Sequence, residues 1–179
     1  MIITISGLHG TGKSTVGKIL SDKLGMRYYS TGQAFRELAK EKNMSLKQFT
    51  NYVEEHPEID LQLDDKIIEV AKQGDILIDS QLSGYLLRDL ADFKILLTCP
   101  IETRIKRMAE RDNSSIEQKL NETVAREKSE LERFKKLYYI NLENTEKNKQ
   151  IYDYIIDTEN LSAHEVVDKI LSTITQKLR

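Results

Sequence analysis

A run of small and charged residues near the start of the chain has the composition of a phosphate-binding loop. Residues 7–14 read Gly-Leu-His-Gly-Thr-Gly-Lys-Ser and match the pattern G-x-x-x-x-G-K-[ST]. The glycines let the backbone curl so that amide N–H groups point at phosphate oxygens, while Lys13 adds a cation and Ser14 a hydroxyl suited to Mg²⁺. The alternative is a glycine-rich turn without a ligand. We predict that a nucleotide triphosphate is bound by Gly7, Leu8, His9, Gly10, Thr11, Gly12, Lys13, Ser14 and Thr15.

An arginine follows the second apolar segment at a spacing that returns it toward the loop. In the sequence Ser30-Thr31-Gly32-Gln33-Ala34-Phe35-Arg36, Thr31 is expected to cap a helix whose first turns carry Arg36. A guanidinium there could hold an acceptor phosphate through two parallel hydrogen bonds. The alternative is a solvated helix face.

Two further arginine pairs each share one helical face. Arg107 and Arg111 are four residues apart, and Arg126 and Arg133 are seven apart. Phosphoryl transfer asks a protein mainly to position two substrates and to neutralise charge on the moving group, and arginine serves both purposes. We expect these pairs to meet the phosphates, although neighbouring carboxylates could instead make each an ordinary solvated face.

Asp79 ends the apolar segment Ile76-Leu77-Ile78, a position suited to an acid that orients magnesium. The alternative is a helix cap that uses Ser80 or Ser83. The histidines are predicted to have no catalytic role: the backbone of His9 should matter more than its ring, and His56 and His164 have the surroundings of surface residues.

Five short apolar segments alternate with helical patterns and are predicted to be strands. They span residues 2–5, 27–30, 75–79, 93–98 and 152–157. Apolar runs without strict alternation are typical of strands that helices cover on both faces. We therefore predict an α/β fold with a doubly wound, five-stranded parallel sheet, whose site lies at the carboxyl ends of the strands.

Helix boundaries are indicated by capping residues. The pairs that fit a capping box are Ser45 with Gln48, Ser114 with Glu117, and Ser162 with Glu165; Pro100 suits a first helical position.

The connections 31–74 and 99–151 are too long for simple crossovers, and both have a charged, helical pattern. Long connections in a compact domain usually act as lids or binding loops, and phosphoryl transfer must exclude water. We predict one insertion that binds an acceptor and one lid that closes over the donor. The alternative is that these segments are extra helices only.

The overall composition favours one domain of 179 residues that acts on small molecules. The 27 basic and 29 acidic residues leave no positive excess for nucleic acid or an anionic membrane. Cys99 is the only cysteine, which is expected to be a small buried hydrophobe in a protein of the reducing cytoplasm. We expect no signal peptide and no membrane span. With no leftover apolar heptads, we expect a monomer.

Together these features resemble the nucleoside monophosphate kinases, and most closely the archaeal type of cytidylate kinase. The resemblance covers nearly the whole chain and rests on the phosphate loop, Ser30-Thr31-Gly32 through Arg36, Asn43-Met44-Ser45-Leu46 with Phe49, Pro57-Glu58-Ile59-Asp60 with Leu63-Asp64, Arg126-Glu127-x-Ser129 with Arg133, and Tyr154-Ile155-Ile156-Asp157-Thr158.

The resemblance implies ATP- and Mg²⁺-dependent phosphorylation of CMP and dCMP. It also implies one P-loop kinase domain, 1–179, with a core of 1–30, 75–108 and 151–179, a helical NMP-binding insertion at 31–74 and a helical lid at about 109–135. In that scheme Arg36 binds the acceptor phosphate, Arg107 and Arg111 lie near ATP, and Arg126 and Arg133 reach over the transferring phosphate.

One position departs from the family pattern. After the third strand the family usually has a glycine-arginine pair whose arginine helps to hold the monophosphate, whereas this chain has Gln81. An amide donates hydrogen bonds without a charge, which could cost about ten- to hundredfold in acceptor affinity or rate. A kinase for UMP or AMP, or a nucleotide-binding regulatory module with little turnover, therefore remains an alternative.

Overall fold

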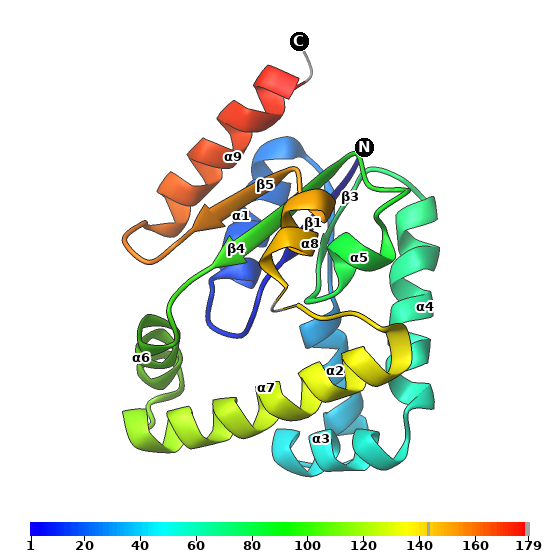
Figure 1. Ribbon diagram of the computed structural model, residues 1–179, viewed down its shortest axis with the longest axis vertical. Coiled ribbons are helices and arrows are strands. Elements are labelled where there is room, and N and C mark those ends of the chain that lie inside the picture. Colours follow the sequence, from blue (N-terminus) through cyan, green and yellow to red (C-terminus); the bar gives the residue numbers. More distant parts are fainter. Residues whose placement is uncertain (143, 178–179) are drawn as a thin grey trace.

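Five parallel strands form the central layer of the computed structural model, which describes residues 1–142 and 144–177. The sheet has the order β2-β3-β1-β4-β5, and every neighbouring pair is parallel (Figure 1). This arrangement confirms the predicted sheet. The strands are β1 (Ile2–Ser6), β2 (Arg27–Ser30), β3 (Ile76–Asp79), β4 (Phe93–Thr98) and β5 (Tyr154–Asp157).

Two of the strands begin later than their apolar patterns predict. β3 begins at Ile76, after Asp75, whose positive φ of 44° interrupts the extended backbone. β5 begins at Tyr154 because helix α8 (Thr145–Ile151) ends only three residues earlier and Tyr152 forms its C-cap.

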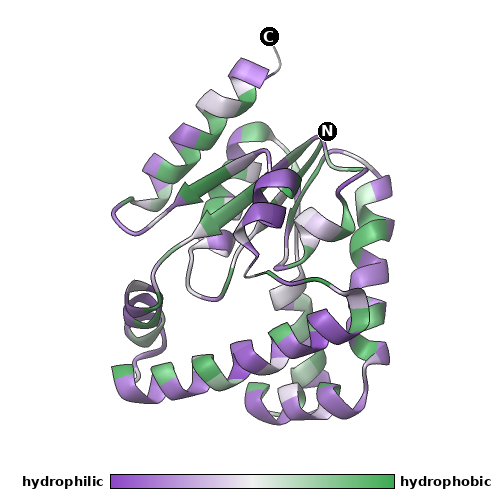
Figure 2. Ribbon diagram, in the orientation of Figure 1, coloured by the Kyte–Doolittle hydropathy of each residue, from purple (hydrophilic) through white to green (hydrophobic). Residues whose placement is uncertain are grey.

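Helices cover both faces of the sheet, which explains why its central strands β1 and β3 are largely apolar and buried. On one face, α1 (Lys13–Leu24) and α9 (Ala163–Lys177) pack against β1 through a buried cluster that includes Ile3, Leu20 and Ile170. On the other face, α4 (Glu58–Lys72) lies over β3, and the short α5 (Ser83–Leu86) lies over β1 and β4. Figure 2 shows hydrophobic strands between helices that are banded with polar residues.

The first long connection is helical and has a small core of its own. It comprises α2 (Thr31–Glu41), α3 (Leu46–Glu55) and α4, whose apolar faces meet in a cluster that includes Phe35, Phe49 and Leu63. The predicted capping box at the start of α3 is confirmed, because Ser45 and Gln48 exchange both hydrogen bonds. A separate core lets this segment project from the sheet as a unit.

The second long connection contains α6 (Ile101–Asp112), α7 (Ile116–Tyr138) and α8. α7 crosses below the carboxyl ends of the strands (Figure 1), and its C-terminal half lies beside α3 and α4. None of the helices described within 1–142 and 144–177 is long and apolar enough to cross a membrane.

The cap of α2 is one residue earlier than predicted. Ser30, not Thr31, is the N-cap: its hydroxyl accepts a hydrogen bond from the Gln33 amide at 3.3 Å. Ser30 ends strand β2 with an extended backbone, which is the conformation an N-cap requires, and Thr31 already belongs to the helix.

Two other helix starts are also shifted by one residue. Ser115, not Ser114, caps α7, because the amide of Ser114 is used to end the preceding helix. Pro100 is the N-cap of α6 rather than its first helical residue, since its ψ of 146° is extended. The capping box predicted at Ser162 and Glu165 is confirmed by reciprocal hydrogen bonds.

Candidate active site

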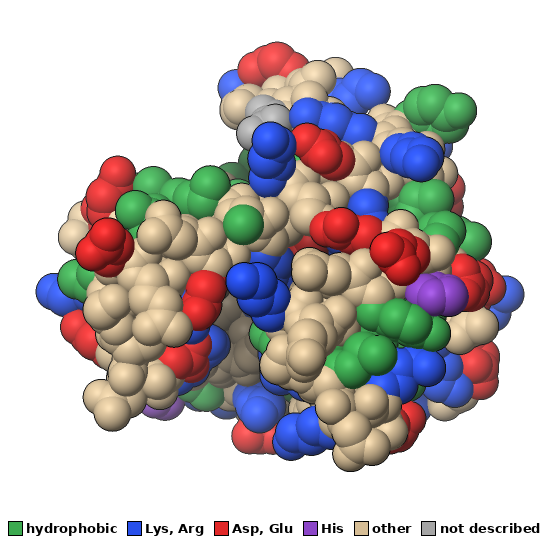
Figure 3. All heavy atoms as spheres, turned by 90° about the horizontal axis from the view of Figure 1, so that it is seen from below, with side chains coloured by type: hydrophobic (Ala, Val, Ile, Leu, Met, Phe, Trp, Pro, Cys, Tyr) green, Lys and Arg blue, Asp and Glu red, His purple; other side chains and the backbone are tan. Residues whose placement is uncertain are grey.

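A large cavity lies below the carboxyl ends of the strands, between the sheet and α7. Its volume is about 1580 Å³, and Figure 3 shows the surface hollowed there, with blue Lys and Arg side chains at the edge. Small-molecule sites usually occupy about 300–1,000 Å³, so this cavity has room for two nucleotide-sized ligands. Of the predicted site residues, only Gly7 and Leu8 do not line it. Those that do are His9, Gly10, Thr11, Gly12, Lys13, Ser14, Thr15, Thr31, Arg36, Asp79, Gln81, Arg107, Arg111, Arg126 and Arg133.

The phosphate loop requires glycine at two of its turns. Gly10 has a φ of 80°, and a Cβ there would lie 2.8 Å from the carbonyl oxygen of Arg104. Gly12, with a φ of 93°, forms the N-cap of α1 without any side-chain cap. The first amide groups of α1 therefore face the cavity, where the positive end of the helix favours an anion.

Lys13 is held at the loop by a backbone carbonyl. Its Nζ donates to the oxygen of Leu8 at 2.9 Å. Loss of surrounding water lowers the pKa of Lys13, although Asp79 and Glu130 act in the opposite direction. A poorly solvated ammonium is stabilised by an anion, so this group is poised for phosphate.

The predicted magnesium-orienting pair is in direct contact. Asp79, which is almost fully buried, accepts hydrogen bonds from the hydroxyls of Ser14 at 2.6 Å, Tyr28 at 2.8 Å and Ser30 at 3.2 Å. Burial and the neighbouring Asp79 carboxylate raise the pKa of Tyr28, so this phenol remains a donor. Asp79 therefore lies beside the loop hydroxyl rather than capping α5, whose N-cap is Leu82.

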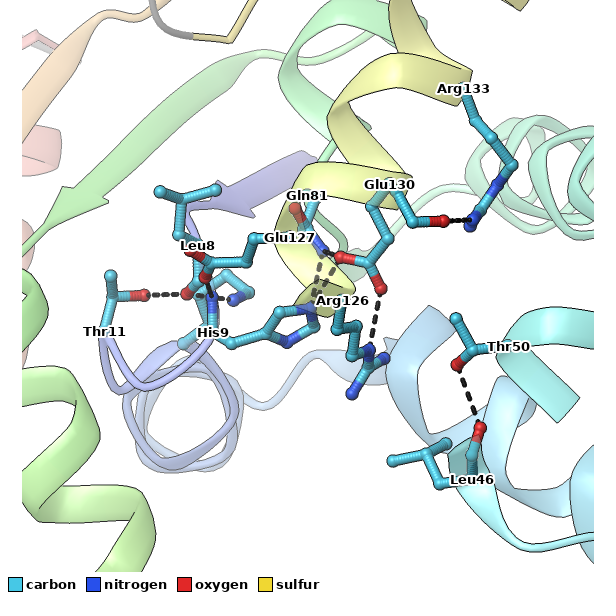
Figure 4. A network of polar contacts seen from close by, with 12 residues as sticks. Leu8, His9, Thr11, Leu46, Thr50, Gln81, Arg126, Glu127, Glu130 and Arg133 are labelled. Carbon is cyan, nitrogen blue, oxygen red and sulfur yellow. Dashed lines mark hydrogen bonds and ion pairs between the residues drawn. The ribbon is translucent and has the colours of Figure 1, made fainter. Parts of the chain in front are cut away.

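The arginines of α7 line the cavity but are paired with carboxylates, as Figure 4 shows for Arg126 and Glu130. Arg126 donates from Nε to Glu130 at 2.8 Å, and its guanidinium lies 5.8 Å from the ring centroid of Phe35. Arg133 donates from Nε to Asp60 at 2.8 Å. A phosphate that reaches these guanidinium groups must exchange with, or add to, their carboxylate partners.

Two of the three arginines of α6, Arg107 and Arg111, line the cavity. Arg107 donates to the hydroxyl of Thr158 at 3.1 Å and to its carbonyl at 2.6 Å, and Thr158 in turn donates to the carbonyl of Thr11 in the phosphate loop at 3.0 Å. Arg111 pairs with Asp112 at 2.7 Å and lowers the pKa of that carboxyl to about 2.

Cys99 differs from the buried hydrophobe expected from sequence. It is only half-buried, and its sulfur accepts a hydrogen bond from Arg107 at 3.6 Å.

Unsatisfied polar atoms mark the part of the cavity that the start of α2 and the segment after β3 form. Among the described residues, the oxygens Oγ1 of Thr31 and Oε1 of Gln81 are buried without a hydrogen-bond partner. Arg36 lines the same cavity from α2. Buried oxygens without partners are costly unless a ligand supplies donors, so this part of the cavity has capacity for a second ligand.

Carboxylates line the wall of the cavity that the insertion provides. Burial raises the pKa of Asp64 to about 6, despite a hydrogen bond from the Tyr138 hydroxyl. Burial also raises the pKa of Asp60, although its ion pair with Arg133 opposes this effect.

Sequence reasoning missed a buried group of charges that connects α6, α7 and the loop. Arg104 donates to both carboxylate oxygens of Glu127, at 2.6 and 3.2 Å, and to the carbonyl of His9 at 2.8 Å. Glu127 and Glu130 are buried with Thr123 and Phe134 on one face of α7. These four buried residues follow one another at intervals of four, three and four positions, which places them on one face of the helix. Because that face ends in the apolar Phe134, the spacing was the available signal that the two acids point inward.

Comparisons with known proteins agree with the geometry. A family model described as an AAA domain matches residues 3–135. A cytidylate kinase from Aeropyrum pernix is 41% identical over 167 residues, with 93% of this chain and 95% of that protein covered. A cytidylate kinase from Methanocaldococcus jannaschii is 37% identical over 177 residues, with 97% of each covered. Shikimate kinase from Acinetobacter baumannii has a similar fold, with a TM-score of 0.61 at 19% identity over 98% of this chain and 93% of that one.

Proposed function

This chain belongs to the cytidylate kinase family, and from that premise we propose that it transfers the γ-phosphate of ATP to CMP. The observation that carries the proposal is that the phosphate loop, the Ser14–Asp79 pair and the α7 arginines all meet in one cavity with room for two nucleotides. The acceptor range includes dCMP.

We assign the donor to the loop end of the cavity. The amides at the start of α1 and the ammonium of Lys13 bind its phosphates, and Arg107 and Arg111 lie toward its nucleoside. Arg107 supports this placement because its contacts with Thr158 connect it to the loop carbonyl of Thr11.

We assign the acceptor to the end that the insertion lines. Arg36 binds its phosphate, and Thr31 and Gln81 offer the unsatisfied oxygens described above. In this scheme residues 31–74 form the NMP-binding insertion, about 109–135 form the lid, and the remaining core is 1–30, 75–108 and 151–179.

The residues at the loop also fit a magnesium ion. A hydroxyl and a carboxylate 2.6 Å apart are oxygen ligands of the kind that Mg²⁺ prefers, and Asp79 is positioned either to bind the ion or to order its waters. When bound with ATP, the ion would neutralise charge on the β- and γ-phosphates.

The chemistry proposed is a direct in-line displacement. A phosphate oxygen of CMP attacks the γ-phosphorus of ATP, the bond to the ADP oxygen breaks, and no covalent enzyme intermediate forms. The attacking oxygen is already ionised near neutral pH, so no strong general base is needed. Lys13, Arg126 and Arg133 are the catalytic residues because they would neutralise charge on the moving group.

Two other acceptor assignments follow from Gln81. The resemblance described above implies an arginine at that position, so an amide there makes two alternatives to the CMP proposal: a different monophosphate, UMP or AMP, or a regulatory module that binds nucleotide with little turnover. We also propose that the protein is a monomer and that it works in the cytoplasm. The free thiol of Cys99 supports the second point, because unpaired thiols are typical of a reducing compartment.

A coupled assay of ADP release separates these possibilities. The purified protein is mixed with Mg-ATP and, in turn, with CMP, dCMP, UMP, AMP and GMP. We expect CMP and dCMP to stimulate ADP release most. No stimulation by any monophosphate, together with tight nucleotide binding measured by calorimetry, would establish the regulatory module instead.

A further inference from the structure

A buried network centred on Glu130 connects the phosphate loop to α7 (Figure 4). Oε2 of Glu130 lies 2.7 Å from Nε2 of His9 and 2.7 Å from Nε2 of Gln81, while Oε1 accepts from Nε of Arg126 at 2.8 Å. The Glu130 side chain is only 7% exposed. A single carboxylate therefore joins residues from the loop, from the segment after β3 and from α7.

The direction of each hydrogen bond follows from the chemistry of the acceptor. An ionised carboxylate only accepts, so His9 must carry a proton on Nε2, and Gln81 must present its amide nitrogen. Burial alone would raise the pKa of Glu130, but His9, Arg126 and Gln81 outweigh burial and lower the pKa below its ordinary value. Glu130 is thus a stable anion whose position its three donors determine.

His9 is attached to α7 through its backbone as well as its ring. Its amide N–H donates to Oε1 of Glu127 at 3.2 Å, and its carbonyl accepts from Arg104, which is itself paired with Glu127. Any shift of α7 relative to the loop must therefore disturb several buried, charge-assisted contacts at once.

We propose that His9 and Gln81 are positioning residues that orient Arg126 through Glu130 and so couple the phosphate loop to α7. Arg126 needs a fixed orientation because its guanidinium must meet the γ-phosphate of ATP while that group moves toward the acceptor. Glu130 supplies that orientation from the protein side, and His9 and Gln81 hold Glu130. The proposal rests on the proposed function in one respect, namely that Arg126 contacts the transferring phosphate.

A double-mutant cycle tests the route through Arg126. We expect His9→Ala to lower kcat about tenfold, as loss of one charge-assisted contact predicts, with a change of less than about threefold in the KM for ATP. His9→Gln should restore most of the rate, because its amide N–H can replace the Nε2 donor. In an Arg126→Ala background, His9→Ala should have little further effect. His164→Ala, an exposed histidine on α9, is the matched control and should leave kcat unchanged.

Hydrogen exchange tests the coupling without any need for turnover. Backbone amides of residues 126–134 should exchange faster in His9→Ala and in Gln81→Leu than in the native chain, and at the native rate in His9→Gln and His164→Ala. Should His9→Ala fail to fold, Gln81→Leu provides the same comparison.

The outcomes separate the two proposals. A native chain that forms no ADP with any monophosphate would overturn the proposed function, while the exchange rates would still decide the coupling. Unchanged exchange in both His9→Ala and Gln81→Leu, or a full tenfold effect of His9→Ala in the Arg126→Ala background, would overturn the positioning role.

Discussion

At the scale of single residues, the cavity contains cations that already have protein partners. Arg126 is paired with Glu130, Arg133 with Asp60, and Lys13 with a backbone carbonyl. Removing one partner from a buried ion pair is strongly destabilising, whereas exchanging it for another anion is not. A phosphate bound in the proposed site would therefore join or replace these partners, which favours ligands that carry enough charge to do so.

Lys13 is expected to matter for turnover far more than for folding. Lys13→Ala should lower turnover by about a hundredfold or more, because it removes a cation from the developing charge. The free energy of unfolding should change little, since the ammonium is poorly solvated in the folded chain. Steady-state kinetics and urea denaturation check both effects, with Lys18→Ala, an exposed lysine on the same helix, as the control. A Lys13→Ala enzyme as active as its parent would show that the loop assignment is wrong.

Gln81 offers a test of acceptor binding. Gln81→Arg should lower the KM for CMP by about tenfold, because it adds a charge-assisted donor beside the proposed acceptor phosphate. The same charge added by Gln33→Arg, on the exposed face of α2, serves as the control and should leave the KM unchanged. If the KM for CMP is the same in Gln81→Arg and the native chain, the acceptor phosphate lies elsewhere.

Asp64 should make the protein less stable as the pH rises. Its pKa is raised from 3.8 to about 6 in the folded chain, so the folded state binds this proton more tightly than the unfolded state does. Protonated Asp64 therefore contributes on the order of 2 kcal/mol to the free energy of unfolding at low pH. This contribution is lost as the pH rises from about 4 to 6.

The test compares Asp64→Asn with the native chain. The difference in unfolding free energy between the two should shift in favour of Asp64→Asn over that pH interval. The exposed neighbour provides a control, because Asp65→Asn should show no such trend. A difference that moves in the opposite direction would contradict the raised pKa.

At the scale of elements, the contact between α5 and Tyr152, the C-cap of α8, is tightly packed. A Cβ added at Gly84 would lie 2.2 Å from Cε1 of the buried Tyr152 ring. Gly84→Ala should therefore destabilise the fold by about 1–3 kcal/mol, measured by chemical denaturation. Gly32→Ala is the matched control, because its nearest neighbour is the flexible end of Arg36 at 3.5 Å. Equal stability of both variants would mean that Tyr152 moves freely.

The sheet and the phosphate loop could be predicted from sequence because their signals are local. Apolar runs identify the strands, and the spacing of glycine, lysine and serine identifies the loop. The predicted N-cap was wrong by one residue where two residues that can cap a helix are adjacent, as at Ser30 and Thr31. Both side chains can accept the capping hydrogen bond, so the sequence alone does not show which of them caps the helix. The placement of predicted site residues around one cavity followed from strand order.

The acidic partners of the site could not be predicted in the same way. Glu127 and Glu130 meet His9 across more than a hundred residues of sequence, and that contact depends on how α7 crosses the sheet. A dense run of charges is ordinarily solvated, so only the apolar spacing with Phe134 indicated burial. The acidic partner of the His9 imidazole could not be predicted either, because the neighbouring residues in the glycine-rich loop carry no sign of it.

At the scale of the whole molecule, α7 ties the second connection to the insertion. Arg133 pairs with Asp60 on α4, and the Ser129 hydroxyl donates to Glu54 on α3. The two walls of the cavity therefore contact each other directly as well as through the sheet. Ligands that bridge these walls should stiffen both segments together.

Ligand binding should consequently stabilise the two connections jointly. A non-hydrolysable ATP analogue and CMP, each at about a hundred times its dissociation constant, should each add about 2.7 kcal/mol of stability. Together they should raise the thermal midpoint further and slow amide exchange in residues 31–72 and 116–138. Calorimetry and hydrogen exchange provide the measurements, and inorganic sulfate at equal ionic strength is the control. Protection limited to the phosphate loop would argue against joint closure.

The position of β1 in the middle of the sheet has a consequence for synthesis. Strand β1 (Ile2–Ser6) is translated before both of its partners, because it pairs with β3 at residues 76–79 and with β4 at residues 93–96. Until both partners have been translated, the nascent chain carries an apolar strand with two unpaired edges. Such a strand is prone to aggregation, so productive folding is expected to be largely post-translational for this half of the protein and to benefit from chaperones.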